Sequence, residues 1–389
     1  MLGGLQMDRG GVLRVAAAAL PAFAYFYNVG SIGFWLPLHV RELGWPYTYI
    51  TLIATWYFTA VTLATPLVGL LSDLTRRPGY ILAGGMAVVA ATSVAMPHVE
   101  NPPLLMALRA LQGLGLAVGL PIALGSLSLI QGVRRGVAST VIASGLGMSG
   151  GAFLSGLMVE YLGFPALFYA AAVTAALSTL VALGWRPPPP PAGGPGLLAA
   201  LRRMPWEVFV VMAGIAVRNT FASGVFSVVS IIFNKIVGIS YTATGVVLAI
   251  NPAVQASVTT VFERLMRGRA LLLYSTGLSG TALAFYLYLT AGSALDLAAA
   301  QIALGAFYGA TVVSGNTMII ALAPSEIRYT ASSLYTFAFN IGWILGTSIA
   351  GKVMDAAGVE AWIKLAIAGT LVSGLIPLTL LASPRARRI

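Results

Sequence analysis

A chain of 389 residues that is 58% hydrophobic and 8% charged is too apolar for a soluble domain, because soluble domains carry about 25% charged residues. The net charge of +11 does not indicate a nucleic-acid partner, since the basic residues lie in short clusters between apolar runs. The absence of cysteine excludes disulfides, and two histidines are too few for a zinc site, so we expect a lipid bilayer as partner and neither a metal nor another cofactor.

Twelve apolar runs, each long enough to cross about 30 Å of hydrocarbon, predict the secondary structure. The expected helices span 13–40, 47–71, 79–97, 103–130, 136–160, 165–184, 206–234, 240–262, 270–290, 294–322, 329–354 and 360–382. The sequence therefore predicts an all-α integral membrane protein with twelve transmembrane helices.

One connection is long enough to separate two domains. Arg186 is followed by five consecutive prolines, Pro187–Pro191. Proline cannot continue a helix, and a proline run forms a semi-rigid spacer. We therefore expect three parts: an N-terminal six-helix lobe over 1–185, a cytoplasmic linker over 186–205 and a C-terminal six-helix lobe over 206–389.

Lysine and arginine are distributed unevenly between alternate loops. If the N-terminus is cytoplasmic, 16 of the 22 basic residues fall on the cytoplasmic side, and two more lie inside helices. The outer side then carries only Arg41, Lys235, Lys352 and Lys364. Cytoplasmic loops are rich in Lys and Arg, so we expect a multi-pass protein of the cell membrane with both termini in the cytoplasm.

The two halves share residues at matching positions. Tyr47–Thr48, at the start of the second helix, recurs 194 residues later as Tyr241–Thr242, at the start of the eighth. Glu160, near the end of the fifth helix, recurs 195 residues later as Asp355, near the end of the eleventh. Nearly equal offsets indicate a duplicated six-helix unit, and such parallel repeats place a substrate site near the membrane midplane between the halves.

The loop between the second and third helices carries a recognisable motif. Gly69, Asp73 and Arg77 match the signature loop of the major facilitator superfamily, although one basic residue of that signature is missing. A degenerate second copy begins at Glu263. In the family this loop is a latch that holds the cytoplasmic ends of the halves together, so the resemblance implies a gating latch formed by these four residues.

Further motifs cover the fourth and fifth helices. Arg109, Gln112 and Gly113 resemble a second motif of the family, and the glycine-rich fifth helix resembles its antiporters, without their glycine–proline step. The whole chain thus resembles a secondary transporter of the major facilitator superfamily. The resemblance implies two pseudo-symmetric six-helix bundles, alternating access by rocking, and a cavity lined by the first, fourth, seventh and tenth helices.

Polar and aromatic residues on these helices and on the eighth and eleventh are the candidates for substrate binding. On the first, fourth, seventh and tenth helices they are Tyr25, Asn28, Trp35, Arg109, Gln112, Arg218, Asn219, Gln301 and Tyr308. The eighth and eleventh helices add Asn251, Gln255, Asn340 and Trp343. Alternatively, each of these could join helices by a hydrogen bond worth about 0.6 kcal/mol.

Arg218 and Arg109 are the two basic residues far from the ends of predicted helices, whereas all eleven acidic residues lie at helix ends or in loops. An arginine in a membrane span costs at least about 2.5 kcal/mol and normally has a function. We therefore expect a small anion, organic or inorganic, as substrate, bound chiefly at Arg218. Backbone carbonyls and water could instead neutralise either arginine.

Other functions were weighed against anion transport. A proton-coupled exporter of amphipathic compounds is the alternative, suggested by the motifs of the fourth and fifth helices and by residues such as Trp56, Phe221 and Trp343. An enzyme would need a catalytic dyad or metal cluster in the spans, which the sequence lacks, and a channel would need neither latch nor duplicated lobes. We expect a monomer with a small-molecule substrate.

The latch predicts a specific effect of Asp73→Asn. A carboxylate at a helix N-terminus is stabilised by the helix dipole, so the neutral variant should insert normally but transport slowly and populate inward-facing states. Exchange rates in proteoliposomes and labelling of single introduced cysteines from either side measure this. Wild-type exchange with unchanged labelling would contradict the latch.

Overall fold

A computed structural model describes residues 9–75, 77–131, 133–184, 201–265, 268–324 and 327–386. These residues form helices and connecting turns, and they contain no strand. The predicted all-α class is confirmed. Most of the predicted linker, 186–205, falls outside the described residues.

The first half contains six membrane-crossing units, of which the first and fourth are built from more than one segment. Its elements are α1 Arg9–Asn28, η1 Val29–Gly33, α2 Phe34–Glu42, α3 Tyr47–Thr75, α4 Pro78–Ala95, η2 Met96–His98, α5 Pro102–Leu116, α6 Gly119–Gln131, α7 Val133–Leu162 and α8 Phe164–Gly184. The second half contains α10 Trp206–Ser227, α11 Val229–Ile231, η3 Ile232–Ile236, α12 Tyr241–Leu265, α13 Ala270–Thr290, α14 Ala294–Leu322, α15 Arg328–Leu375 and η5 Ile376–Ala382.

Ten stretches of the described residues are long and apolar enough to cross a membrane. One of them, Thr330–Ala382, has 53 residues, which as one helix would measure about 80 Å against a hydrocarbon core of about 30 Å. Gly358 interrupts it with φ 84°, a conformation that favours glycine, so this stretch contains two crossings. With α12 added, the described helices agree with the twelve predicted from the sequence.

Two predicted helices are not continuous, and these predictions were wrong in detail. The predicted helix 103–130 is divided between Leu116 and Gly119, because Pro121 has no N–H with which to continue the helical hydrogen bonds. The predicted helix 206–234 is interrupted at Val228, whose φ is −127°. Just beyond this break, the Ser230 hydroxyl donates to the Phe34 carbonyl of the first half, 2.5 Å away.

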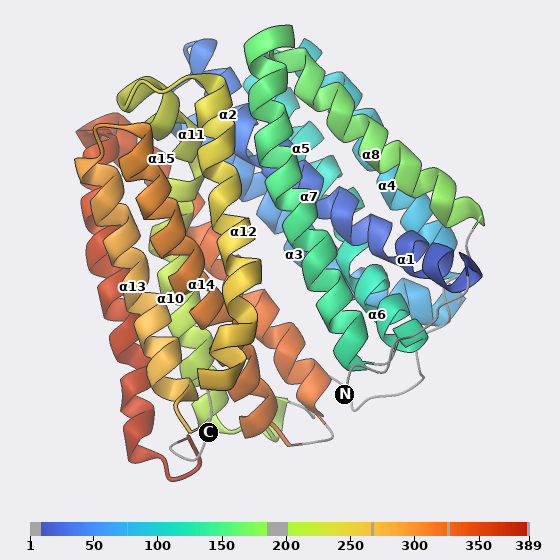
Figure 1. The fold of residues 1–389 in the computed structure, drawn as a ribbon, viewed down its shortest axis with the longest axis vertical. Helices are drawn as coiled ribbons and strands as arrows, with labels where there is room; N and C mark the ends of the chain where they lie inside the picture. Colours follow the sequence, from blue (N-terminus) through green and yellow to red (C-terminus); the bar gives the residue numbers. More distant parts are fainter. Residues whose placement is uncertain are drawn as a thin grey trace.

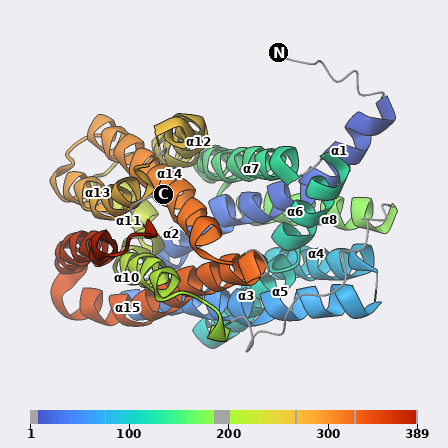
Figure 2. The same ribbon diagram turned by 90° about the horizontal axis from the view of Figure 1, so that it is seen from below.

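The halves meet along two pairs of helices. α7 lies beside α12, and α3 lies beside the first part of α15 (Figure 2). Glycines allow close approach in the first pair: a Cβ added at Gly156 would lie 2.8 Å from the Tyr241 carbonyl oxygen and 2.9 Å from Gly245 Cα. Small residues give membrane helices this proximity, so the pairing depends on glycine at these positions.

The repeated acidic residues each cap a helix of the opposite half. The Asp355 carboxylate accepts from the backbone N–H groups of Tyr47 and Thr48, both at 2.8 Å, and from the Thr48 hydroxyl at 2.6 Å. Its counterpart Glu160 accepts from the backbone N–H of Thr242 at 3.2 Å. A carboxylate at a helix N-terminus satisfies free N–H groups and interacts favourably with the dipole, so the duplication builds two related contacts between the halves.

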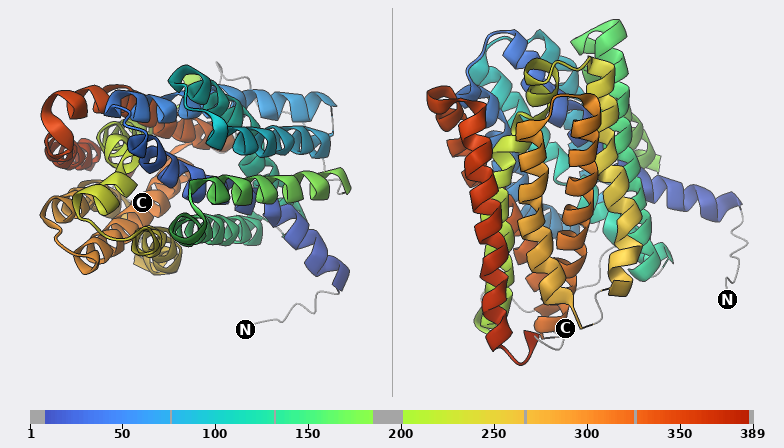
Figure 3. Two further views of the ribbon diagram at one scale, coloured as in Figure 1. Left: turned by 90° about the horizontal axis from the view of Figure 1, so that it is seen from above. Right: turned by 60° about the vertical axis from the view of Figure 1, so that its left-hand side comes forward.

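These caps belong to one end of the molecule, which we call the closed end. Glu42 adds a third contact there, accepting from Lys235 at 2.7 Å and from the Tyr241 hydroxyl at 2.5 Å. From the closed end the helices of the first half incline away from those of the second (Figure 1). The N-terminal part of α1 projects sideways from the bundle (Figure 3).

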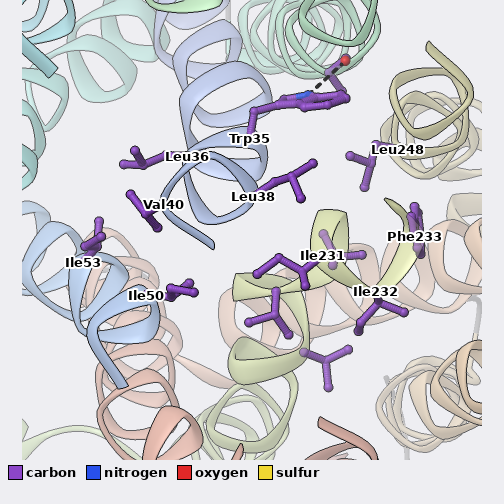
Figure 4. Close-up of a cluster of buried hydrophobic side chains, with 14 of the residues drawn as sticks. Trp35, Leu36, Leu38, Val40, Ile50, Ile53, Ile231, Ile232, Phe233 and Leu248 are labelled. Carbon is purple, nitrogen blue, oxygen red and sulfur yellow. Dashed lines mark hydrogen bonds between the residues drawn. The ribbon is translucent and has the colours of Figure 1, made fainter. Parts of the chain in front are cut away.

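Apolar side chains fill the closed end beneath the polar contacts. Figure 4 shows Leu36, Leu38, Ile50 and Ile53 of the first half packed with residues of the second half that include Ile231. All five are at most 4% exposed. Burial of this much apolar surface excludes water from between the halves, so the closed end is sealed.

Neutralising the two caps should loosen the closed end. Asp355→Asn combined with Glu160→Gln removes the charge that interacts with both helix N-termini, so we expect the end to open more often. The chain has no cysteine, so Ile50→Cys, a buried position at this end, can be labelled with an impermeant maleimide. We expect faster labelling from the closed-end side in the double variant, and labelling at the wild-type rate would contradict the role of the caps.

Candidate functional site

A cavity lies between the halves, directly beneath the sealed end. It encloses about 570 Å³, part of it open to solvent, and is lined by η1, α2, α3 and α5 of the first half and by α10 and α15 of the second. Its lining is mostly apolar, contains Arg109 as a cation, and contains no aspartate or glutamate.

Arg109 reaches the cavity from α5 and is only 5% exposed. Its terminal Nη1 donates to the Gln112 amide oxygen, one helical turn further along. Its guanidinium carbon lies 4.3 Å from the centre of the Tyr57 ring on α3, a cation–π contact that strengthens when water is excluded. Arg109 is therefore held by neutral partners, and its positive charge is not cancelled.

A chain of hydrogen bonds fixes Gln112 in turn. Its amide nitrogen donates to Ser93 on α4 at 2.9 Å and lies 3.5 Å from the Asn28 amide oxygen on α1. The Asn28 amide nitrogen donates to the Ala24 carbonyl at 2.9 Å. Hydrogen bonds from α1, α4 and α5 thus orient the Arg109 side chain. Two of the predicted binding residues, Asn28 and Gln112, belong to this network and hold Arg109 in place.

Aromatic rings from both halves form one wall of the cavity, here called the aromatic wall: Phe58, Trp343 and Phe226. The Phe58 and Trp343 ring centres are 4.4 Å apart with planes at 30°, and those of Trp343 and Phe226 are 5.7 Å apart at 19°. All three residues line the cavity. The wall therefore joins α3 of the first half to α10 and α15 of the second.

Three polar groups of cavity-lining residues are buried without a hydrogen-bond partner among the described residues. They are the Nε–H of Arg109, the indole N–H of Trp343 and the hydroxyl of Tyr57. Buried polar groups are normally paired, and one that is not has often lost a ligand or water from its surroundings. Two of these groups can only donate and the hydroxyl can donate or accept, which suits a ligand that accepts hydrogen bonds.

Arg218 lies behind this cavity and does not line it. It is 1% exposed, donates to the Asn219 amide oxygen at 2.9 Å and lies 3.3 Å from the Thr281 hydroxyl. Its guanidinium is 5.4 Å from the centre of the Phe226 ring and 4.9 Å from that of Tyr308. Arg218 therefore packs against the back of the aromatic wall.

The remaining predicted binding residues lie outside the cavity lining. Asn219 donates to the Phe339 carbonyl at 3.1 Å, and Trp35 donates to the Ala152 carbonyl at 3.2 Å, so both join helices. Gln301 and Asn340 are buried. The half-buried members of the set are Tyr25, Asn251, Gln255 and Tyr308.

The predicted latch is only partly within the described residues. The side chains of Asp73 and Glu263 fall outside them, and Gly69 lies within α3. Arg77 is exposed, and its guanidinium lies 6.0 Å from the centre of the Tyr80 ring. The latch thus stays a prediction from the motif.

Sequence reasoning missed Tyr57, Phe58 and Phe226. Tyr57 and Phe58 lie on the second helix, which the family resemblance does not place among the cavity-lining helices, and Phe226 lies just before the break in α10. A usable signal was the helical spacing of Tyr57 from Ile50 and Ile53, which puts one side of α3 toward the cavity.

Comparisons with known proteins agree with this architecture. The family model described as Major Facilitator Superfamily matches residues 18–267 and 209–388. The chain belongs to the Major Facilitator Superfamily. It is therefore a secondary transporter and not an enzyme.

Individual relatives are more distant. The 4-hydroxybenzoate transporter PcaK of Pseudomonas putida is 35% identical over 122 residues, which are 31% of this chain and 27% of that one. The match thus spans about a quarter of the curated relative's length. A mutant of the nucleoside transporter NupG superposes with TM-score 0.81 at 14% identity, over 95% of this chain and 99% of that one. A bacterial homolog of the human lysosomal transporter Spinster, in an inward-facing and occupied conformation, superposes with TM-score 0.74 at 14% identity. The superposition covers 98% of this chain and 97% of that one. These structures support the fold.

The hydrogen-bond chain predicts that Gln112→Leu destabilises the first half. The change would leave Arg109, Ser93 and Asn28 short of a partner, and an unsatisfied buried polar group costs about 1–3 kcal/mol. We expect a melting temperature several degrees below wild type in detergent. Gln255→Leu, at a half-buried position on α12, is the control and should have a smaller effect. Equal melting temperatures of both variants and the wild-type protein would contradict the proposed contribution of the hydrogen-bond network to stability.

Proposed function

We propose that this chain is a secondary active transporter that moves a small anion across the cell membrane by alternating access. The observation that carries the proposal is Arg109, a buried cation in the cavity between the halves. The ion pairs found among the described residues, Lys235–Glu42 and Lys364–Glu360, both lie elsewhere. A buried charge without a counter-ion is costly, and an anionic substrate would supply the missing charge.

The geometry favours Arg109 over Arg218 as the group that contacts the anion. Arg109 lines the cavity and keeps an unpaired N–H, whereas Arg218 is separated from the cavity by Phe226. We assign Arg218 a supporting role, because its guanidinium holds the rear of the aromatic wall. The sequence alone favoured the opposite order.

The proposed orientation places the closed end on the outer side of the membrane. Arg41 and Lys235 lie at that end, whereas the many arginines of the opposite segments suit the cytoplasmic side. In this orientation both termini are cytoplasmic, and the structure is an inward-facing state. The substrate would reach Arg109 from the cytoplasm in this state and from outside once the closed end opens.

One relative supports an organic anion as the substrate. The partial match to a 4-hydroxybenzoate transporter concerns a protein whose named substrate is an aromatic carboxylate. The alternative, a proton-coupled exporter of amphipathic compounds, is supported by the aromatic wall. It would ordinarily need a titratable carboxyl group in the cavity, and no such group is among the residues that line it.

Charge removal at Arg109 tests the proposal. We expect Arg109→Gln to abolish anion binding and transport, and Arg109→Lys to retain weak binding because lysine keeps the charge but loses the planar fork. Arg203→Gln, at an exposed position, is the control and should behave as wild type. The measurements are ligand-induced thermal stabilisation and uptake by proteoliposomes. Undiminished anion uptake by Arg109→Gln would contradict the proposal.

A second variant separates charge from fold. Gln112→Glu is nearly isosteric and places a carboxylate within hydrogen-bond distance of Arg109, so the pair would be neutral while the side chains stay in place. We expect loss of anion binding in a folded protein, with a melting temperature below that of wild type because the carboxylate cannot donate to Ser93 and Asn28 as the Gln112 amide does. Retention of full anion affinity in a folded Gln112→Glu protein would favour the exporter.

A further inference from the structure

We propose that the cavity selects aromatic monocarboxylates, with the carboxylate bound at Arg109 and the ring packed against the aromatic wall of Phe58, Trp343 and Phe226. This inference rests on the proposed anion transport and narrows the class of anion. It follows from the number of charges, the kind of hydrogen-bonding groups and the shape of the lining.

The charge of the lining fits one negative group. Arg109 is the cation among the cavity-lining residues, and most of the others are apolar. Arg218 cannot serve as a second contact in this state, because Asn219, Thr281 and the Phe226 ring surround its guanidinium. A second carboxylate on the ligand would be buried against apolar side chains without a partner, which is costly.

The hydrogen-bonding groups fit a carboxylate better than a strongly hydrated inorganic anion. The unpaired Arg109 Nε–H and Trp343 indole N–H are donors, and a carboxylate offers acceptors only. Phosphate or sulfate would need more donors to replace its water than this mostly apolar lining provides. The site thus offers few donors and a large apolar surface.

The apolar surface is aromatic where the halves meet. Phe58 comes from the first half, and Trp343 and Phe226 come from the second. A flat ring can pack in offset or edge-on contact with these rings, which adds to the benefit of burial. Because such a ligand touches both halves, its binding is sensitive to their relative position, as alternating access requires.

The test compares ligands that differ in one property. Benzoate and cyclohexanecarboxylate share size and charge but differ in aromaticity, and we expect benzoate to bind the purified wild-type protein about two- to tenfold more tightly. Acetate and phosphate should bind more weakly still. Terephthalate, which adds a second carboxylate to the same ring, should bind about tenfold or more weakly than benzoate. Dissociation constants come from titration followed by calorimetry or thermal shift.

Variants at Trp343 test whether the aromatic wall causes the preference for benzoate over cyclohexanecarboxylate. Trp343→Leu should remove the preference for benzoate over cyclohexanecarboxylate while leaving carboxylate binding measurable, and Trp343→Phe, which keeps a ring, should retain most of it. Trp56→Leu is the matched control, because Trp56 is 51% exposed and does not line the cavity. If Trp343→Leu fails to fold, the comparison of Trp343→Phe with Phe58→Leu replaces it.

The outcomes separate this inference from the proposed function. Equal affinity for benzoate and cyclohexanecarboxylate would overturn the proposed selectivity for aromatic monocarboxylates, and so would tighter binding of terephthalate or phosphate than of benzoate. Either result would leave the proposal of anion transport standing. Absence of binding by every anion in the series would overturn both. The expected ranking, lost in Trp343→Leu and kept in Trp56→Leu, would support both.

Discussion

The structure depends on how a positive charge is kept inside a bundle of apolar helices. Each half buries one arginine, Arg109 or Arg218, and surrounds it with amides, hydroxyls and aromatic rings. Neutral partners satisfy the hydrogen bonds of a guanidinium without cancelling its charge. The charge of Arg109 therefore stays available at the cavity, and the surrounding side chains are arranged so that it points there.

The repeat in the sequence explains why two related contacts hold the closed end. The two acidic caps, Asp355 and Glu160, occupy matching positions in the repeat and each contacts the opposite half. Both are partly solvent-exposed contacts, which form and break more readily than a buried core does. Apolar residues such as Ile50 and Ile231 seal the same end. The halves are thus held by contacts that can separate together, while each half keeps its own core.

Much of the fold could be predicted from the sequence, because the lipid bilayer imposes simple rules on helix length and on the placement of charged residues. The all-α fold and its membrane-crossing helices followed from such rules, and the selection of Arg109 and Gln112 as candidate binding residues stays a prediction. The preference proposed for Arg109 over Arg218 did not follow from these rules, because it depends on Phe226, which packs against the Arg218 guanidinium and lines the cavity. The aromatic wall was equally hidden, since its rings come from three helices and meet only after packing.

The central claim is that the cavity carries an uncompensated positive charge. Benzoate, benzamide and benzylamine test it directly, because they share a ring and are anionic, neutral and cationic at pH 7. We measure the affinity of the purified wild-type protein for each by titration. The account predicts that benzoate binds most tightly and that benzylamine does not bind measurably. Tighter binding of benzylamine than of benzoate would contradict it.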